Sequence, residues 1–141
     1  MGNFRDYGDD LSYRGQITVA DVHELAAMGF RSIVCNRPDS EEGAVPSSAI
    51  EQAARRLGVA FVYQPVEFSQ LGPLDGASFA DALDTLPRPL LAYCRTGRRC
   101  AALWVLARAP RLGADAALAA SRACGCDLEE LRPRLPQTRP E

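Results

Sequence analysis

One stretch of the sequence constrains the fold more than any other. Between residues 89 and 107 an apolar run, a loop that contains a glycine, and a second apolar run follow one another. The residues from Pro89 to Tyr93 are typical of a buried strand, whereas the apolar residues from Ala101 to Ala107 recur at helical spacing. The loop 94–100 therefore connects a strand to the start of a helix, which we predict over residues 99–108.

This loop has the composition of an anion site built around a thiol. The first turn of a helix leaves backbone N–H groups unpaired and carries the positive end of the helix dipole. Arg95, Arg98 and Arg99 lie within five residues of Cys94, and such surroundings can lower a cysteine pKa from about 8.5 to roughly 4–7. Cys94 could instead be a small buried hydrophobe. The combination of cations, Gly97 and a strand-to-helix connection favours a thiolate nucleophile.

The six residues from Cys94 to Arg99 resemble the active loop of rhodanese-type sulfurtransferases. They are also similar, less closely, to the phosphate loop of cysteine-dependent phosphatases, in which five residues separate the cysteine from the arginine. Here four residues separate Cys94 from Arg99, and Cys100 stands where the phosphatase arginine would be. The spacing therefore favours sulfur chemistry over phosphate chemistry.

In the sulfurtransferase interpretation, each residue of the loop has a role. Cys94 takes up a sulfane sulfur as a persulfide, cradled by the backbone N–H groups of the loop, including those of Thr96 and Gly97. Arg99 would hold the anion through two hydrogen bonds. Arg95 and Arg98 would bind a sulfonate or the carboxylates of an acceptor, although Arg98 could equally belong to a solvated basic rim.

The rest of the chain alternates between predicted strands and helices. This alternation predicts a parallel sheet covered by helices on both faces, with the site at the carboxyl ends of its strands. We predict a single α/β domain over residues 1–141, with a core over about 11–123 and a frayed tail over 132–141. The predicted strands lie within 11–17, 30–35, 59–63 and 89–93, and the predicted helices lie within 18–28, 48–57, 75–86, 99–108, 114–121 and 127–131. The helix over 48–57 is assigned from a capping box, Ser48 to Glu51.

Charge and cysteine content exclude several classes of protein. The net charge of −2 and the pI near 5.5 argue against general nucleic-acid binding. There is no apolar run of membrane-spanning length and no apolar leader, so we expect a cytoplasmic protein without a membrane partner. The five cysteines are read as thiols. The only histidine is His23, and Cys124 and Cys126 lack a zinc spacing, so we expect no metal and no cofactor.

Several segments in order resemble the phosphatase-like domain of the beta-lactamase hydrolase-like family. They include the polar stretch from Asn36 to Glu42, the pair Pro65-Val66, the Cys94 loop and Leu103-Trp104. The likeness covers roughly residues 11–110 and implies the fold of dual-specificity and tyrosine phosphatases. Members occur alone or fused to persulfide-handling metallo-hydrolase domains, and they have been labelled both phosphatase-like and sulfur transferase.

The departures from phosphatases of this fold bear on the chemistry. Those enzymes carry a histidine just before the nucleophile, where this chain has Tyr93, and a general-acid aspartate where it has Phe68. Such an acid contributes about 10²–10⁴-fold to hydrolysis of a phosphate ester. Glu67 or Asp75 could replace it, although Asp75 also reads as a helix cap.

Two further cysteines could act on Cys94. Cys100 could stabilise the thiolate or serve as a resolving thiol. Cys35 ends a strand that we expect beside the Cys94 strand, so a disulfide between Cys35 and Cys94 is an alternative to simple packing.

Three functions remain open at this point. The first is a rhodanese-type sulfurtransferase that moves a sulfane sulfur from thiosulfate or a persulfide to a thiol acceptor such as glutathione. The second is a phosphatase of dual-specificity type acting on a phosphate ester through a phosphocysteine intermediate. The third is a non-catalytic module that binds a small anion. Both enzyme interpretations require a reactive Cys94 thiolate, and a thiol shut in the apolar interior would contradict them.

Overall fold

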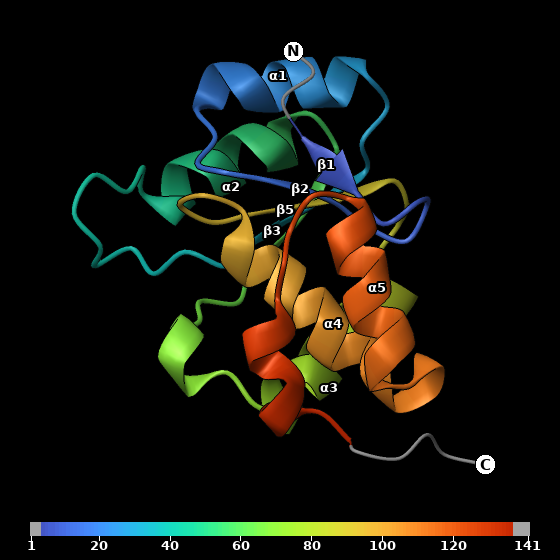
Figure 1. The fold of residues 1–141 in the computed structure, drawn as a ribbon. Helices are drawn as coiled ribbons and strands as arrows, with labels where there is room; N and C mark the ends of the chain where they lie inside the picture. The colour runs from blue at the N-terminus through green and yellow to red at the C-terminus, as the bar shows by residue number, and fades with distance from the viewer. Residues whose placement is uncertain (1–3, 137–141) are drawn as a thin grey trace.

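The computed structural model describes residues 4–136 and contains a five-stranded sheet in the order β1-β2-β5-β3-β4 (Figure 1). Strands β2 (Ser12–Arg14), β5 (Leu90–Tyr93), β3 (Ser32–Cys35) and β4 (Ala60–Tyr63) are parallel. The short strand β1 (Arg5–Asp6) adds an antiparallel edge. The sequence analysis missed β1, because two exposed charged residues carry no strand pattern.

Helices cover both faces of the sheet (Figure 1). α1 (Val19–Ala27) and α2 (Ser47–Arg56) pack on one face, and α3 (Pro73–Thr85), α4 (Arg98–Leu112) and α5 (Ala114–Ala123) lie on the other. The two faces carry separate apolar clusters because side chains alternate along each strand. In β5, Leu91 joins the α1–α2 cluster and Ala92 joins the α3–α5 cluster.

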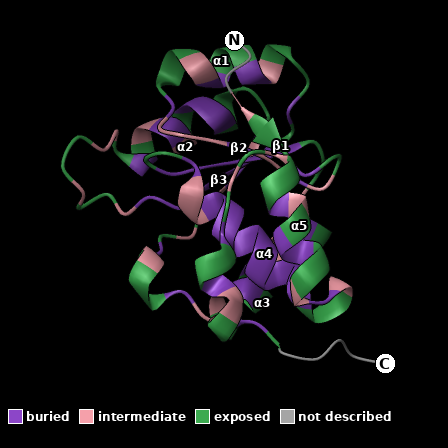
Figure 2. Ribbon diagram, viewed as in Figure 1, coloured by how far each residue is buried: buried purple, intermediate pink, exposed green. Residues whose placement is uncertain are grey.

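Helix α4 is the centre of the second layer. Every residue from Cys100 to Ala109 is buried, and α4 is the most continuously buried helix in Figure 2. A helix that is apolar all round needs cover on every side, and α3 and α5 supply it. Gly76 in α3 lets that helix approach closely, since a Cβ there would stand 2.7 Å from the carbonyl carbon of Leu106.

The local signals predicted the start of α1 but not the start of α2. α1 begins after Thr18 with the expected cap, whose hydroxyl accepts from the Asp21 N–H at 3.2 Å. The capping box assigned to Ser48 is wrong, because α2 already begins at Ser47. A distant carboxylate caps it instead: Asp39 accepts from the Ser47 N–H at 2.8 Å and from the Ser47 hydroxyl at 2.7 Å.

The predicted core of 11–123 is too short at both ends. Tyr7 is buried near the start, and its hydroxyl donates to the Ala101 carbonyl at 3.1 Å. After α5 the chain forms the 3₁₀ helix η2 (Glu129–Arg134), from which Leu131 and the following Leu135 enter the core. The expectation of a frayed tail is therefore wrong for residues 132–135, because apolar burial fixes them. Residues 137–141 of the predicted tail lie outside the described part of the chain.

Candidate active site

The Cys94 loop lies at the carboxyl end of β5, in contact with the residues that follow β2. The Cys94 N–H donates to the Arg14 carbonyl at 3.3 Å, and the Gln16 N–H donates to the Arg95 carbonyl at 3.3 Å. Gly15 permits this approach, since a Cβ there would stand 2.7 Å from the Arg95 carbonyl oxygen. Gly97, at φ 95°, makes the turn into α4. The predicted strand–loop–helix arrangement is confirmed.

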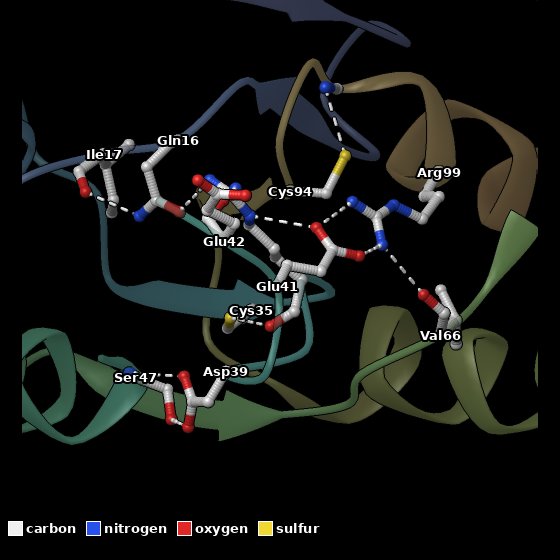
Figure 3. A network of polar contacts seen from close by, with 12 residues as sticks. Gln16, Ile17, Cys35, Asp39, Glu41, Glu42, Ser47, Val66, Cys94 and Arg99 are labelled. Atoms are coloured by element: carbon white, nitrogen blue, oxygen red, sulfur yellow. Dashed lines mark hydrogen bonds and ion pairs between the residues drawn. The ribbon is translucent and has the colours of Figure 1, made fainter. Parts of the chain in front are cut away.

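Hydrogen-bond donors surround the sulfur of Cys94. The Gly97 N–H lies 3.1 Å from Sγ (Figure 3). The Cys100 thiol does most to lower the pKa of Cys94, which falls to about 5, and the backbone N–H groups of Cys100, Arg99 and Gly97 lower it further against the opposing effect of burial. Cys94 is therefore a thiolate at neutral pH, and Cys100 is the largest contributor to its ionisation.

Arg99 also contacts Cys94, but its two terminal nitrogens are committed elsewhere. A hydrogen bond from Arg99 reaches the Cys94 sulfur. The guanidinium forms a two-point ion pair with Glu41, in which Nη2 donates to Oε1 at 2.9 Å and Nη1 donates to Oε2. Nη1 also donates to the Val66 carbonyl at 3.1 Å (Figure 3). The residue predicted to hold the substrate anion therefore already holds a carboxylate.

The other loop residues fall into two groups. Arg95 and Thr96 are exposed, and among the described residues no hydrogen bond or ion pair holds the Arg95 side chain. Arg98 is engaged by other groups: it pairs with Glu130 of η2, and its guanidinium carbon lies 4.9 Å from the centre of the Phe68 ring. The rim interpretation describes the position of Arg98 better than the substrate-binding one.

Cys35 lies on the neighbouring strand, as predicted, but it faces the other layer. Its register partner is Tyr93, and its side chain belongs to the α1–α2 cluster, whereas Cys94 belongs to the α3–α5 cluster. The Cys35 thiol donates to the Arg37 carbonyl at 3.3 Å, and burial raises its pKa. A disulfide between Cys35 and Cys94 would have to cross from one face of the sheet to the other.

The two candidate acids lie together in a pocket beside Val66. Glu67 and Asp75 line it with Pro38, Pro65 and Gln70. The Asp75 carboxylate accepts from the Gly72 N–H at 3.0 Å. Asp75 therefore does cap α3, but from inside its first turn, because the helix begins at Pro73 and not at Asp75 as predicted. Phe68 begins the 3₁₀ turn η1 (Phe68–Gln70) and packs under Arg98. Neither Cys94 nor Arg99 lines this pocket.

Sequence reasoning missed Glu41, Arg37 and Gln16 as site residues. Arg37 is buried, and it donates to Glu41 at 3.0 Å and to the side-chain oxygen of Gln16 at 3.0 Å. A signal was available, because charged residues directly after the β3 strand fall at the sheet edge where ligands bind. From the sequence, the polar stretch 36–42 indicated only the family resemblance and no role in the site.

The environment of Cys94 is both buried and polar. The residue is fully buried, so a substrate can reach its sulfur only if neighbouring groups move. However, the sulfur accepts hydrogen bonds from N–H groups, a thiol and a guanidinium. The thiolate is thus stabilised, in contrast to the neutral thiol of a cysteine in a purely apolar interior.

Two other features are missing from the described residues, a metal-binding cluster and a membrane-spanning helix. Within residues 4–136, no cluster of three or more histidine, cysteine, aspartate or glutamate side chains could hold a metal ion. None of the helices in that range combines the length and the apolar character needed to cross a bilayer.

The fold and the thiolate loop together define a cysteine-based, phosphatase-like α/β domain. The family model described as "Beta-lactamase hydrolase-like protein, phosphatase-like domain" matches residues 3–111, and the chain belongs to this family. The Beta-lactamase hydrolase-like protein of Xylella fastidiosa (strain Temecula1 / ATCC 700964) is 33% identical over 126 residues, which are 87% of this chain and 29% of that protein. The protein of the same name from Agrobacterium fabrum (strain C58 / ATCC 33970) is 34% identical over 100 residues, 70% of this chain and 23% of that protein. The chain thus spans less than a third of these curated relatives.

Solved structures confirm the predicted fold class. A candidate phosphatase from Neisseria meningitidis matches with a TM-score of 0.80 and 34% identity, over 92% of this chain and 94% of that one. TpbA from P. aeruginosa, solved in complex with phosphotyrosine, matches with a TM-score of 0.63 and 18% identity, over 89% and 75%. The second likeness shows the fold alone. The prediction of a phosphatase-like domain of the beta-lactamase hydrolase-like family is also confirmed.

Proposed function

We propose that this domain is a sulfurtransferase that carries a sulfane sulfur on Cys94. The Cys94 thiolate attacks the outer sulfur of a donor, a new S–S bond forms at Cys94, and the donor leaves as a thiolate or as sulfite. An acceptor thiolate such as glutathione then attacks the outer sulfur of the Cys94 persulfide. This second step restores the Cys94 thiolate and gives a new persulfide on the acceptor.

The positions of the candidate acids favour sulfur transfer over ester hydrolysis, because none of them is placed to protonate a leaving group at Cys94. This observation carries the proposal. When the P–O bond of a phosphate ester breaks, the alcohol leaves as an alkoxide unless an acid protonates its oxygen. Phe68 stands at the acid position of the phosphatase pattern, Asp75 is engaged at the start of α3, and Glu67 is exposed in a pocket without Cys94. A thiolate leaving group is already a stable anion and needs no such acid.

The ionisation of the Cys94 thiol also supports sulfur transfer. A thiol attacks a disulfide or persulfide sulfur best when it is ionised at the working pH. The Cys100 thiol and the backbone N–H groups hold the pKa of Cys94 at about 5. The nucleophile is therefore ready at neutral pH without a general base.

Phosphate ester hydrolysis is the second candidate, and the comparisons favour it. The chain belongs to a family described as phosphatase-like, and the structurally similar proteins include phosphatases. One of them was solved with phosphotyrosine. In this alternative Cys94 forms a phosphocysteine, and Glu67 is the nearest substitute for the missing acid along the chain.

Mass spectrometry of the intact protein separates these candidates. After incubation with glutathione persulfide, we expect one added sulfur on the wild type and on Cys35→Ser, a matched control that removes a buried thiol from the neighbouring strand. The Cys94→Ser variant should gain none. Turnover of an aryl phosphate without any sulfur adduct would support the phosphatase instead. If neither reaction occurs while phosphate raises the melting temperature, the domain is an anion-binding module.

A further inference from the structure

The carboxylate of Glu41 lies between two arginines at the edge of the Cys94 site. Arg99 pairs with it through both terminal nitrogens, and Arg37 donates to it through Nε at 3.0 Å (Figure 3). The side chain of Glu41 is 25% exposed, against 12% for Arg99 and 5% for Arg37. The hydrogen bond from Arg99 and that from Arg37 keep the pKa of Glu41 below its ordinary value. Glu41 is therefore an ionised and partly accessible group.

Its neighbours hold Glu41 in this position. The remaining nitrogens of Arg37 donate to the Gln16 side chain at 3.0 Å and to the Glu42 carbonyl at 2.8 Å. Asp39 anchors the same loop to the start of α2 through Ser47. The ion pair between Glu41 and Arg99 is thus held in place by the surrounding structure, although the two residues are 58 positions apart in the sequence.

This contact changes the charge that an incoming substrate meets. Two guanidinium groups face two negative groups, Glu41 and the Cys94 thiolate, so the positive charge of Arg99 and Arg37 is balanced before a substrate arrives. A dianion would have to displace a carboxylate from Arg99 and then lie beside two negative charges. Like charges brought together in a site of this kind are strongly unfavourable.

We propose that Glu41 is a specificity-determining residue, which occupies the terminal nitrogens of Arg99 and thereby excludes dianionic tetrahedral substrates from Cys94. The substrate class that remains is a persulfide, whose reacting end carries at most one negative charge. Phosphate monoesters and thiosulfate are dianions and are disfavoured. The inference rests on the proposed sulfur transfer for its substrate, but the exclusion of dianions by Glu41 can be tested without that reaction.

The step at Cys94 balances for such a donor. The thiolate of Cys94 attacks the terminal sulfur of R–S–SH, a new S–S bond forms between that sulfur and Cys94, and the S–S bond of the donor breaks. The products are Cys94–S–SH and RS⁻, so the proton stays on the transferred sulfur and the electron pair leaves with the donor thiolate. No other reactant is required.

The test compares Glu41→Gln with Glu42→Gln, a matched control that removes one negative charge from the next, exposed residue. Gln keeps the shape of Glu41 and can still accept from Arg37. The first readout is protection of Cys94 from iodoacetamide by inorganic phosphate. We expect Glu41→Gln to bind phosphate about 10-fold or more tightly than the wild type, and Glu42→Gln to stay within about 3-fold.

The second readout is transfer of sulfur to Cys94 from two donors. The wild type should accept sulfur from glutathione persulfide and little from thiosulfate, whereas Glu41→Gln should gain thiosulfate transfer. Equal use of both donors by the wild type, or unchanged or weaker phosphate binding in Glu41→Gln, would overturn the inference. If no persulfide reacts but Glu41→Gln still binds phosphate more tightly, the exclusion of dianions stands and the sulfur transfer fails. Thermal melts of both variants check that they fold.

Discussion

The thiol of Cys100 donates a hydrogen bond to the sulfur of Cys94, from the first turn of α4 to the end of β5. The two residues respond in opposite directions. The pKa of Cys94 falls to about 5, whereas burial and the neighbouring Cys94 raise the pKa of Cys100 well above its ordinary value. Cys100 thus remains a neutral donor while Cys94 is a thiolate.

Removing this donor should make Cys94 a weaker acid. In Cys100→Ala we expect the pH midpoint of iodoacetamide alkylation of Cys94 to rise from about 5 by at least about one pH unit, because a hydrogen bond to the charged form is lost. Cys100→Ser should keep a low midpoint, since a hydroxyl can donate in the same way. An unchanged midpoint in Cys100→Ala would contradict the assigned role.

A methyl group at Gly15 should disturb the Cys94 loop. The Cβ of Gly15→Ala would stand 2.7 Å from the Arg95 carbonyl oxygen, and backbone atoms cannot move aside as a flexible side chain can. We expect a loss of about 1–3 kcal/mol in the free energy of unfolding and slower alkylation of Cys94. Gly72→Ala is the control, because a Cβ there meets no atom within 4 Å. Equal stability of the two variants would refute this explanation.

Acid should destabilise the fold through Asp10. Partial burial alone would raise the pKa of this carboxyl, but hydrogen bonds from Arg108, Arg88 and Trp104 outweigh burial and hold the pKa below its ordinary value. A lowered pKa in the folded state adds stability above the unfolded value of 3.8, and that stability is lost as the pH falls below it. Urea unfolding of the wild type should therefore show a decline in stability below about pH 4.

The variant Asp10→Asn isolates this contribution. At pH 7 we expect it to cost about 2–3 kcal/mol, because the buried Arg108 loses a charged partner. The loss should shrink as the pH falls below about 4, since the wild-type carboxyl is then being protonated. Asp84→Asn, on the exposed side of the same arginine, should cost less. A cost for Asp10→Asn that stays constant from pH 7 to pH 2.5 would disprove the linkage.

The two rim arginines should differ in how they attract anions. The Arg95 side chain is exposed, whereas the charge of Arg98 is paired with Glu130. We expect Arg95→Ala to lower the rate of alkylation by iodoacetate relative to iodoacetamide by about 2–3-fold, and Arg98→Ala to change that ratio less. Because both reagents attack the same thiol, the ratio of the two rates removes any effect of the substitution on the reactivity of the thiol itself. A larger effect from Arg98→Ala would show that this residue, despite its ion pair, guides substrates.

Local sequence was sufficient for much of the fold. The spacing of apolar residues predicted the strands β2 to β5 and the helices α1 to α5, because each pattern reflects the face that the element buries. It failed for β1, which has no such pattern, and for the starts of α2 and α3. Asp39 caps α2 from eight residues upstream of Ser47, and no rule of adjacent residues includes that contact.

Register explains the outcome for Cys35. The strand that ends at Cys35 is predicted beside the strand that leads to Cys94, and the structure confirms this pairing. The alternation of side chains then sends Cys35 and Tyr93 to one face, and Cys94 to the other. A shift of one residue in register reverses the face of every side chain in a strand. Neighbouring strands therefore do not by themselves bring two cysteines together.

By itself the sequence determined which thiol is ionised. A strand, a glycine turn and a helix start are consecutive in the chain, so the donors that ionise Cys94 come from its own loop, and short-range geometry fixes them. Only the tertiary structure decided what the arginines do. Arg99 meets Glu41 across 58 residues and Arg98 meets Glu130 across 32, and such pairings depend on how separate elements pack. The reactivity of the sulfur is thus a local property, while the charge around it is set by the whole fold.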